Sequence, residues 1–298
     1  MNEQIKELLR PEILNTVNGL ELVARIIVEG FMSGSNRSQS VGAGMEFSQY
    51  RGYEPGDDLR QLDWKMFARS ERYYVKQADI ETNITVKFII DASLSMGYTE
   101  GGITKMQYAR IVAAALAYLA RKQSDAFGLY MINESKVTAV QPRNEHAQFM
   151  RFLHALIRVK AEGRWNQSSE LDHLHGGAGK DLIIFITDLY DEKGDLFDFI
   201  SGLKTSRNEV IVIHLLGKHE ADFDFDGAYT FEDMESGERI KIDTRLQQKE
   251  YAVRVADWIK ASRDRLLGRQ VDYLMIRMDE GVERSLRTFL TVRKRLSR

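Results

Sequence analysis

Hydrophobic and polar positions alternate in blocks along this chain, and one block organises the others. Val86, Phe88, Ile89 and Ile90 form a nearly continuous apolar run that is rich in β-branched side chains. Such a run is typical of a strand that is buried on both faces of a parallel sheet. Residues 181–187 repeat this design, and an acidic residue follows each run. The pattern therefore predicts two buried strands that each end in a carboxylate.

Alternating helices and strands fill most of the remaining chain. Amphipathic periodicity predicts helices at residues 3–32, 105–122, 146–159, 196–204, 246–267 and 282–296. Short apolar runs predict strands at residues 73–77, 127–132, 136–140 (an edge strand), 210–215 and 273–276, and a surface hairpin near residues 228–243. We expect Pro11 to interrupt the first helix and Gly30 with Gly34 to end it. The alternation indicates a mostly parallel sheet with helical crossovers.

Composition narrows the function classes. The chain has 298 residues, of which 43% are hydrophobic, enough for one large domain or two smaller ones. Its 44 acidic and 42 basic residues nearly balance, so net charge creates no field that would attract nucleic acid or an anionic membrane. The absence of cysteine excludes disulfides, thiolate metal sites and a cysteine nucleophile.

The sequence carries no recognisable targeting or membrane signal. Its N-terminus is polar and acidic, unlike a signal peptide. The longest apolar run, residues 111–120, is too short to span a bilayer. We expect a soluble, cytoplasmic protein.

Polar side chains follow the first buried strand at alternate positions. Asp91, Ser93 and Ser95 leave the carboxyl end of that strand, where open α/β sheets bind ligands. A carboxylate and two hydroxyls at this spacing can converge on one point, and hard oxygen donors suit Mg²⁺ or Mn²⁺. The alternative is that both serines only cap the following turn and helix.

Residues 44–65 form a second informative segment, which is rich in charged and aromatic side chains. Pro55-Gly56 fits the central pair of a type II turn, and Asp57 can cap a short helix behind it. Charges of both signs could form an ion-pair network that holds the N-terminal region on the main domain. The alternative is a docking surface for a protein partner, because Arg, Tyr and Trp anchor interfaces. The candidate partner-binding residues are Arg51, Tyr53, Arg60 and Trp64.

Several short motifs follow one another at characteristic spacing between residues 46 and 96. They are Glu46-Phe47, Tyr50-Arg51, Tyr53-x-Pro55-Gly56-Asp57, Arg60-x-Leu62-Asp63-Trp64, Ala68-Arg69 and Asp91-x-Ser93-x-Ser95-Met96. With these motifs the chain resembles bacterial domain-of-unknown-function family 58 along nearly its whole length. The family is similar to von Willebrand factor A domains, and its members are often encoded beside MoxR-type AAA+ ATPases.

The resemblance implies a doubly wound, Rossmann-like α/β fold of the von Willebrand factor A type, with an N-terminal helical and short β extension. We expect residues 1–80 to form that extension, packed on the main domain. Residues 81–298 are expected to form the main domain, with the hairpin near 228–243 as an insertion.

The resemblance also implies a metal-ion-dependent adhesion site, in which three loops at strand ends supply ligands. By this similarity Asp91, Ser93 and Ser95 match the first loop, and Asp188 matches the third. A metal held mainly by one carboxylate and two neutral hydroxyls would keep an open position. A Glu or Asp of a partner protein could then complete its coordination.

The second loop departs from the family pattern. Where the family commonly has Gly-Gly-Thr-Asp, this chain has Trp165 in the place of the threonine. Asn166 or Ser168 could supply an oxygen instead; otherwise the metal site is incomplete.

Weaker signals favour ordinary structural roles. Residues 176–180 are similar to a phosphate-binding loop, but Asp181 follows the lysine where Ser or Thr is needed, and the loop precedes a strand. His173 and His175 have no nearby third ligand in sequence, so we interpret them as solvent-exposed. The basic residues 293–295 fit a solvated helix end.

Two classes of function follow from these observations. The preferred hypothesis is a non-enzymatic protein–protein interaction module with an acidic partner; the resemblance implies a MoxR-type AAA+ ATPase engaged in chaperone or assembly work. The alternative is a metal-dependent phosphatase or phosphotransferase with Asp91 as the nucleophile. That chemistry expects a second carboxylate where Ser93 stands.

Overall fold

The computed structural model describes residues 9–38, 49–53, 64–77, 84–134, 136–165, 180–190, 194–234 and 237–296. The chain forms two compact units. The first consists of residues Met1–Met32 and Asn83–Arg298, and the second of residues Ser33–Thr82.

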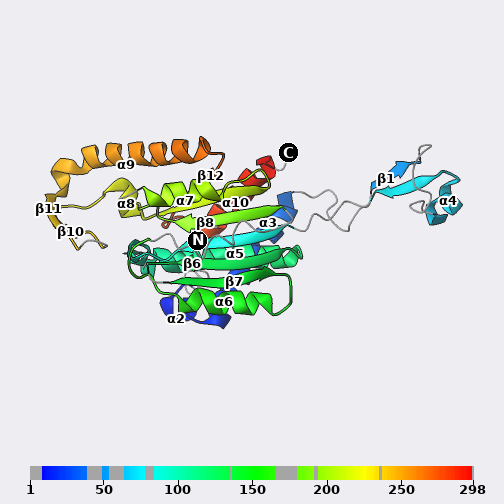
Figure 1. The fold of residues 1–298 in the computed structure, drawn as a ribbon, viewed down its shortest axis with the longest axis horizontal. Coiled ribbons are helices and arrows are strands. Elements are labelled where there is room, and N and C mark those ends of the chain that lie inside the picture. The colour runs from blue at the N-terminus through cyan, green and yellow to red at the C-terminus, as the bar shows by residue number, and fades with distance from the viewer. Residues whose placement is uncertain are drawn as a thin grey trace. The chain divides into compact units, whose positions relative to one another are not determined.

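The described part of the first unit is built on a six-stranded sheet with the order β12-β9-β8-β3-β6-β7 (Figure 1). The strands are β3 (Thr85–Asp91), β6 (Ala126–Ile132), β7 (Val137–Arg143), β8 (Asp181–Thr187), β9 (Asn208–Leu216) and β12 (Asp272–Arg277). Neighbouring strands run parallel, except that β7 pairs antiparallel with β6 at the edge. The predicted α/β fold with a mostly parallel sheet is confirmed.

The two central strands, β3 and β8, are buried almost throughout. Each is buried from its second residue to its last, as the apolar runs predicted. Lys87 is a buried charged residue inside β3, and its ammonium lies 2.6 Å from the carboxylate of Asp181 on β8. Burial on both faces is possible because helices cover both sides of the sheet.

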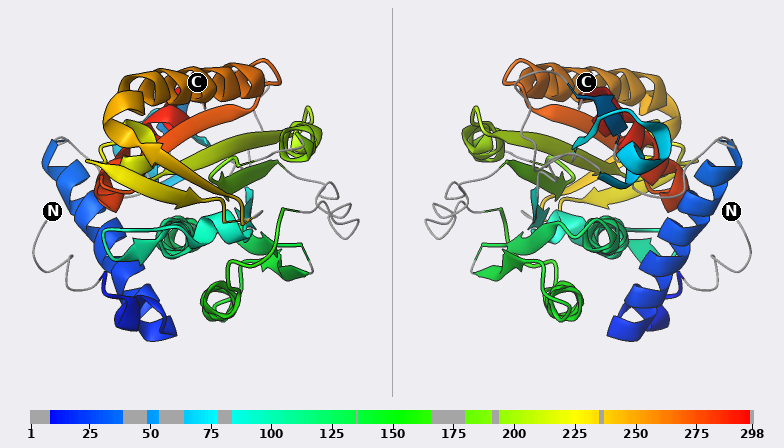
Figure 2. Two further views of the ribbon diagram at one scale, coloured as in Figure 1. Left: turned by 90° about the vertical axis from the view of Figure 1, so that its left-hand side faces the viewer. Right: turned by 90° about the vertical axis from the view of Figure 1, so that its right-hand side faces the viewer.

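Helices pack on the two faces of the sheet in two hydrophobic clusters (Figure 2). One face carries α2 (Pro11–Leu14), α3 (Val17–Ser38), α5 (Lys105–Lys122), α6 (Gln148–Arg158) and α10 (Val282–Leu296). The other carries α7 (Asp195–Leu203) and α9 (Thr244–Leu267). None of the helices within the described ranges is long and apolar enough to cross a membrane.

The start of α5 is fixed by a capping box. The Thr104 hydroxyl accepts the Gln107 N–H at 3.0 Å, and the Gln107 side chain accepts the Thr104 N–H at 2.9 Å. This reciprocal pair satisfies two N–H groups that the first turn of a helix leaves unpaired. The helix that follows the Asp91 loop therefore begins at a defined residue, Lys105.

Leu9 and Arg10 are not helical and Pro11 begins α2, in agreement with the predicted interruption; in this first turn the missing N–H of proline costs nothing. A second break at Asn15 and Thr16 was not predicted. The predicted end of the helix was wrong. Gly30 and Gly34 do not end the second helix, because α3 continues through both to Ser38. A glycine inside a helix costs only about 1 kcal/mol, which neighbouring contacts offset.

Smaller elements surround the carboxyl ends of the strands. They are the 3₁₀ turn η2 (Leu94–Gly97), β4 (Thr99–Glu100), β5 (Ile103–Thr104), α8 (Lys218–Asp222), β10 (Ala228–Glu232) and β11 (Arg239–Asp243). The last two form an antiparallel hairpin within the range 228–243.

The second unit contains a two-stranded sheet and a short helix. β1 (Gln49–Gly52) pairs antiparallel with β2 (Tyr74–Gln77), and α4 (Trp64–Ser70) lies between them in sequence. Residues 54–63, which include the Pro55-Gly56 turn, lie outside the described residues. The packing of this segment on the main domain therefore stays a prediction.

The N-terminal helix α3 contributes directly to the main core, which a pair of substitutions can test. Leu20 is fully buried in the core cluster, whereas Leu22 on the same helix is 36% exposed. Leu20→Ala should lower the free energy of unfolding by about 2–5 kcal/mol, since it leaves a cavity. Leu22→Ala should change it by less than about 0.5 kcal/mol. Urea denaturation followed by circular dichroism measures both; equal effects would contradict the burial of this helix in the core.

Candidate functional site

Adjacent parallel strands bring a carboxylate and a hydroxyl together at one edge of the sheet. β3 and β8 pair in register from Thr85 opposite Asp181 to Ile90 opposite Ile186, so Asp91 follows beside Thr187. The Thr187 hydroxyl donates to Asp91 Oδ2 at 2.8 Å, and Asp91 is 0% exposed. Sequence analysis did not select Thr187, although the register of two equal parallel strands would have indicated it.

The loop after β3 links the predicted metal residues into one chain of hydrogen bonds. The Ser93 N–H donates to Asp91 Oδ1 at 2.9 Å, and the Ser93 and Ser95 hydroxyl oxygens lie 3.1 Å apart. The Ser95 hydroxyl donates to Asp188 Oδ1 at 3.2 Å. The structure therefore brings together all four residues, Asp91, Ser93, Ser95 and Asp188. We refer to them as the strand-end site.

The serine side chains do not act as the simple caps that the alternative interpretation required. Ser93 occupies the cap position of η2, but its side chain makes no capping hydrogen bond there. The helix α5 is instead capped by Thr104. Both serine hydroxyls are thus directed into the strand-end site.

A buried lysine beside the strand-end site is a second residue that sequence analysis missed. The Lys105 ammonium lies 2.8 Å from Asp188 Oδ2 and 2.7 Å from Glu220 Oε1. Its side chain is only 3% exposed. The available signal was its place as the first residue of the helix that follows the Asp-x-Ser-x-Ser loop.

The two carboxyls of the site have opposite pKa shifts. Burial, together with the nearby charge of Asp188, raises the pKa of Asp91 to about 6. Burial would also raise the pKa of Asp188, but the Lys105 ammonium outweighs it and lowers that pKa below its usual range. Asp188 is therefore the ionised partner of Lys105, and Asp91 is the carboxyl that burial disfavours as an anion.

The loop after β8 turns sharply beneath the hairpin tip. Leu189 adopts a left-handed backbone conformation with a φ of 56°. Its N–H donates to the Thr187 hydroxyl at 3.0 Å. The Tyr190 hydroxyl donates to the carboxylate of Asp233 at the end of β10, and the Met234 side chain lies beside Gly97 of η2. The hairpin tip thus borders the strand-end site.

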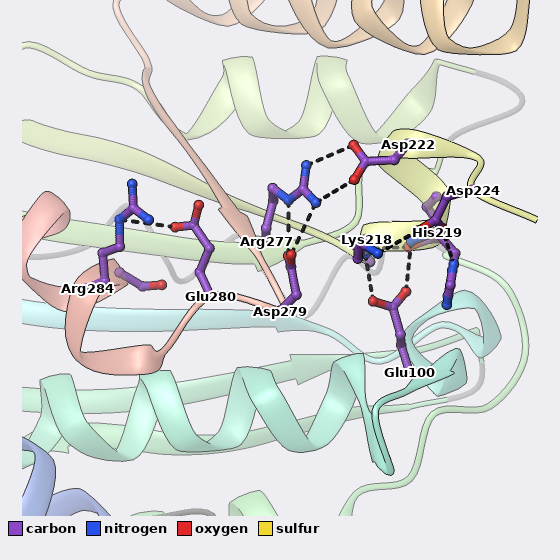
Figure 3. Close-up of polar contacts among 12 residues, drawn as sticks. Glu100, Lys218, His219, Asp222, Asp224, Arg277, Asp279, Glu280 and Arg284 are labelled. Atoms are coloured by element: carbon purple, nitrogen blue, oxygen red, sulfur yellow. Dashed lines mark hydrogen bonds and ion pairs between the residues drawn. The ribbon is translucent and has the colours of Figure 1, made fainter. Parts of the chain in front are cut away.

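The helix α8, which carries Glu220, is held from two directions (Figure 3). The Glu100 carboxylate accepts the backbone N–H groups of Lys218 and His219 at 2.8 and 3.0 Å. Arg277 donates to both carboxylate oxygens of Asp222 at 2.9 and 2.7 Å. These contacts fix the helix that presents the second partner of Lys105.

The segment predicted as the second loop does lie beside the first. The Leu94 N–H donates to the Gly163 carbonyl at 2.7 Å, so the two loops are joined through their backbones. Trp165, however, packs against Phe185 and Phe199 in the core, with ring centroids 5.6 and 5.3 Å away. An indole offers no oxygen ligand. Residues 166–179, which include Asn166 and Ser168, lie outside the described residues.

The chemistry of the donor set fits a hard divalent cation. Two serine hydroxyls and the Asp188 carboxylate are directed to one region, and such oxygen donors suit Mg²⁺ or Mn²⁺. Within the described ranges, no three His, Cys, Asp or Glu side chains converge to hold a metal. A metal here would therefore depend on hydroxyl groups and water besides carboxylates.

The predicted partner-binding residues lie in the second unit. Tyr53, Tyr73, Phe67 and Trp64 form a row in which successive ring centroids are 6.2, 4.5 and 6.3 Å apart. Trp64 is 61% exposed. We call these four residues the aromatic row. Large exposed aromatic side chains of this kind anchor protein interfaces.

Other candidates cannot be placed in the site. Arg60 lies outside the described residues, and Arg51 is described only by its backbone on β1. His173 and His175 are also outside them, as is most of the segment 176–180.

Comparison with known proteins identifies the family. The family described as protein of unknown function DUF58 matches residues 49–263. The chain belongs to the DUF58 family. An uncharacterized protein of Mycobacterium tuberculosis is 24% identical to this DUF58 chain over 245 residues, which cover 80% of the chain and 76% of that protein. An uncharacterized protein of Mycobacterium bovis matches equally.

Solved structures with a similar arrangement have low sequence identity to the DUF58 chain. The conserved hypothetical protein BatB from Bacteroides thetaiotaomicron is 11% identical with a TM-score of 0.46, covering 72% of this chain and 100% of BatB. The SpRpn10 VWA domain is 12% identical with a TM-score of 0.38, covering 68% of this chain and 93% of that domain.

The raised pKa of Asp91 predicts how stability depends on pH. A carboxyl with a pKa of about 6, above its ordinary 3.8, holds its proton more tightly in the folded chain. Its stabilising contribution is full below pH 3.8 and is lost as the pH rises through about 6. In EDTA at about pH 8, Asp91→Asn should therefore raise the free energy of unfolding by about 1–3 kcal/mol.

The gain from Asp91→Asn should disappear as the pH falls towards 4, because the wild-type carboxyl then becomes neutral as well. Chemical denaturation over this pH range measures the difference. Asp198→Asn is the matched control, since that side chain is 79% exposed and should show no such gain. An Asp91→Asn variant that is less stable than the wild type at pH 8 would contradict the burial cost.

Proposed function

We propose that this DUF58 protein is a non-enzymatic protein-interaction module whose strand-end site binds Mg²⁺ or Mn²⁺ together with a carboxylate of an acidic partner. The observation that carries this proposal is the hydrogen-bonded chain from Asp91 through Ser93 and Ser95 to Asp188. It places neutral and charged oxygen donors at the carboxyl ends of parallel strands, where open α/β sheets bind ligands.

The residues of the site have two proposed roles: some coordinate the ion directly, and one contributes negative charge without contacting it. The Ser93 and Ser95 hydroxyls are the proposed direct ligands. Asp91 is fully buried and both of its oxygens accept hydrogen bonds, so it contributes negative charge from behind the serines. When bound, the ion would supply an open coordination position for the partner's carboxylate.

The same burial argues against the phosphotransfer alternative. A nucleophilic carboxylate needs an oxygen that can reach the phosphorus atom. Asp91 is 0% exposed, with one oxygen held by the Ser93 N–H and the other by the Thr187 hydroxyl. The neutral Ser93 also stands where a second carboxylate would be needed. These features support a binding role over a catalytic one.

We propose a MoxR-type AAA+ ATPase as the partner, in chaperone or assembly work in the cytoplasm. The family resemblance suggests this class of partner. The aromatic row provides a second surface for it in the other unit, with Arg51 and Arg60 as further candidates from the sequence. The exposed Trp64 is the strongest anchor among them, because Trp most often dominates interface energetics.

Metal binding to the strand-end site should appear as thermal stabilisation. At a metal concentration about 100 times the Kd, linkage stabilises the folded state by about 2.7 kcal/mol, which raises the Tm of a chain this size by roughly 5 °C or more. The wild type should show this rise with Mn²⁺ or Mg²⁺ after EDTA treatment. Asp91→Asn and Ser95→Ala should reduce it, whereas Asp198→Asn should not. No shift in the wild type would remove the metal from the proposal.

Partner binding should depend on both surfaces. With a purified MoxR-type AAA+ ATPase from the same organism, Trp64→Ala and Asp91→Asn should each raise the Kd roughly thirtyfold, a loss of about 2 kcal/mol. Tyr229→Ala, which removes an exposed aromatic side chain from the hairpin, is the control. Biolayer interferometry measures the three variants against the wild type. Undiminished binding by both Trp64→Ala and Asp91→Asn would dissociate these surfaces from the function.

A further inference from the structure

A buried lysine lies next to the proposed metal ligands, and the helix on which it stands gives no reason for a positive charge at that position. Lys105 is the first residue of α5, where a cation opposes the helix dipole, and the first turn of α5 contains no acidic residue. Its ammonium is instead held between Asp188 Oδ2 at 2.8 Å and Glu220 Oε1 at 2.7 Å. The position of this charge is therefore set by the carboxylates of the site.

Both carboxylates that hold the ammonium are fixed by other contacts. Glu220 Oε2 accepts the Gly217 N–H at 2.8 Å, on the helix α8 that is itself anchored on two sides (Figure 3). Asp188 Oδ1 accepts the Tyr190 N–H at 3.3 Å. Lys105 consequently stays in the site as a permanent positive charge.

This charge opposes a divalent cation in two ways. It occupies Asp188 Oδ2, the oxygen of that carboxylate that the serine loop leaves unused. It also repels any second cation nearby, and the repulsion is strong because the lysine side chain is only 3% exposed and little water screens it. Part of the negative charge that the strand-end site would offer to a metal is thus already neutralised.

We propose that Lys105 is a resident cation that keeps the affinity of the strand-end site for divalent metal low. This inference rests on the proposed metal-binding function. It implies that tight binding needs additional negative charge, which an acidic partner would bring. Metal and partner then strengthen each other's binding, since such coupling is reciprocal.

Isothermal titration calorimetry of the full chain with Mn²⁺ alone, without a partner, tests the inference. Lys105→Met keeps the length of the side chain and removes its charge, and it should lower the Kd for Mn²⁺ about tenfold or more. Lys218→Met is the matched control. That lysine pairs with Asp224 at the surface, so its loss should change the Kd by less than about twofold.

A second variant guards against misfolding and against a general charge effect. If Lys105→Met unfolds in EDTA because Asp188 and Glu220 are left unpaired, the paired variant Lys105→Met with Glu220→Gln is measured instead. It removes one charge of each sign, so the net charge of the protein is unchanged. It should still bind Mn²⁺ more tightly than the wild type, because Asp188 is released. Equal or weaker binding would overturn the role of Lys105.

The outcomes separate this inference from the function on which it rests. If the wild type and the Lys105 variants bind Mn²⁺ equally while Asp91→Asn does not bind it, the role of Lys105 is overturned and the metal site stands. If no variant binds Mn²⁺, both are overturned. The inference is supported if the Lys105 variants bind Mn²⁺ more tightly than the wild type and the Lys218→Met control does not.

Discussion

The burial of two neighbouring carboxyls is the constraint that shapes this end of the sheet. Asp91 and Asp188 are 0% and 3% exposed, and they end adjacent parallel strands. Two buried like charges repel strongly in a medium of low dielectric constant. This repulsion is offset by one ammonium, from Lys105, and by hydroxyl and N–H groups that donate to the other carboxylate oxygens. One carboxyl is thereby stabilised as an anion, and the other has its pKa raised to about 6.

The apolar runs predicted the sheet and an acid at the end of each buried strand, whereas the family resemblance implied that Asp91 and Asp188 belong to one site. Apolar runs without alternation indicate strands buried on both faces, and such strands belong to parallel sheets. Parallel neighbours end at the same edge, so an acid at the end of each run places the two carboxyls together. The proximity of Ser93 to Ser95 was predictable from the local sequence alone, since both residues lie within a single turn of the chain.

Long-range partners and the second break in the first helix could not be predicted in this way. Lys105 contacts Asp188 and Glu220, which lie 83 and 115 positions further along the chain, and no local sequence pattern relates the three residues. Thr187 has the appearance of an ordinary strand residue until the register with β3 is known. For the first helix, glycine was given too much weight as a breaker, because burial of Leu20 and Ile27 outweighs the cost of the glycines further along α3. The second break, at Asn15 and Thr16, contains neither proline nor glycine and so left no such signal.

The loops of the strand-end site are held by apolar packing, which explains the presence of Leu189 and Trp165 in them. Leu189 adopts a left-handed conformation that costs about 1–2 kcal/mol for a residue with a Cβ. Glycine would avoid that cost but would lose a side chain that is buried in the core beside α7. Trp165 likewise gives up the oxygen that a threonine would offer and fills the space against Phe185 and Phe199. Both residues hold the loops by packing, so the polar groups of the site are positioned by hydrophobic contacts behind them.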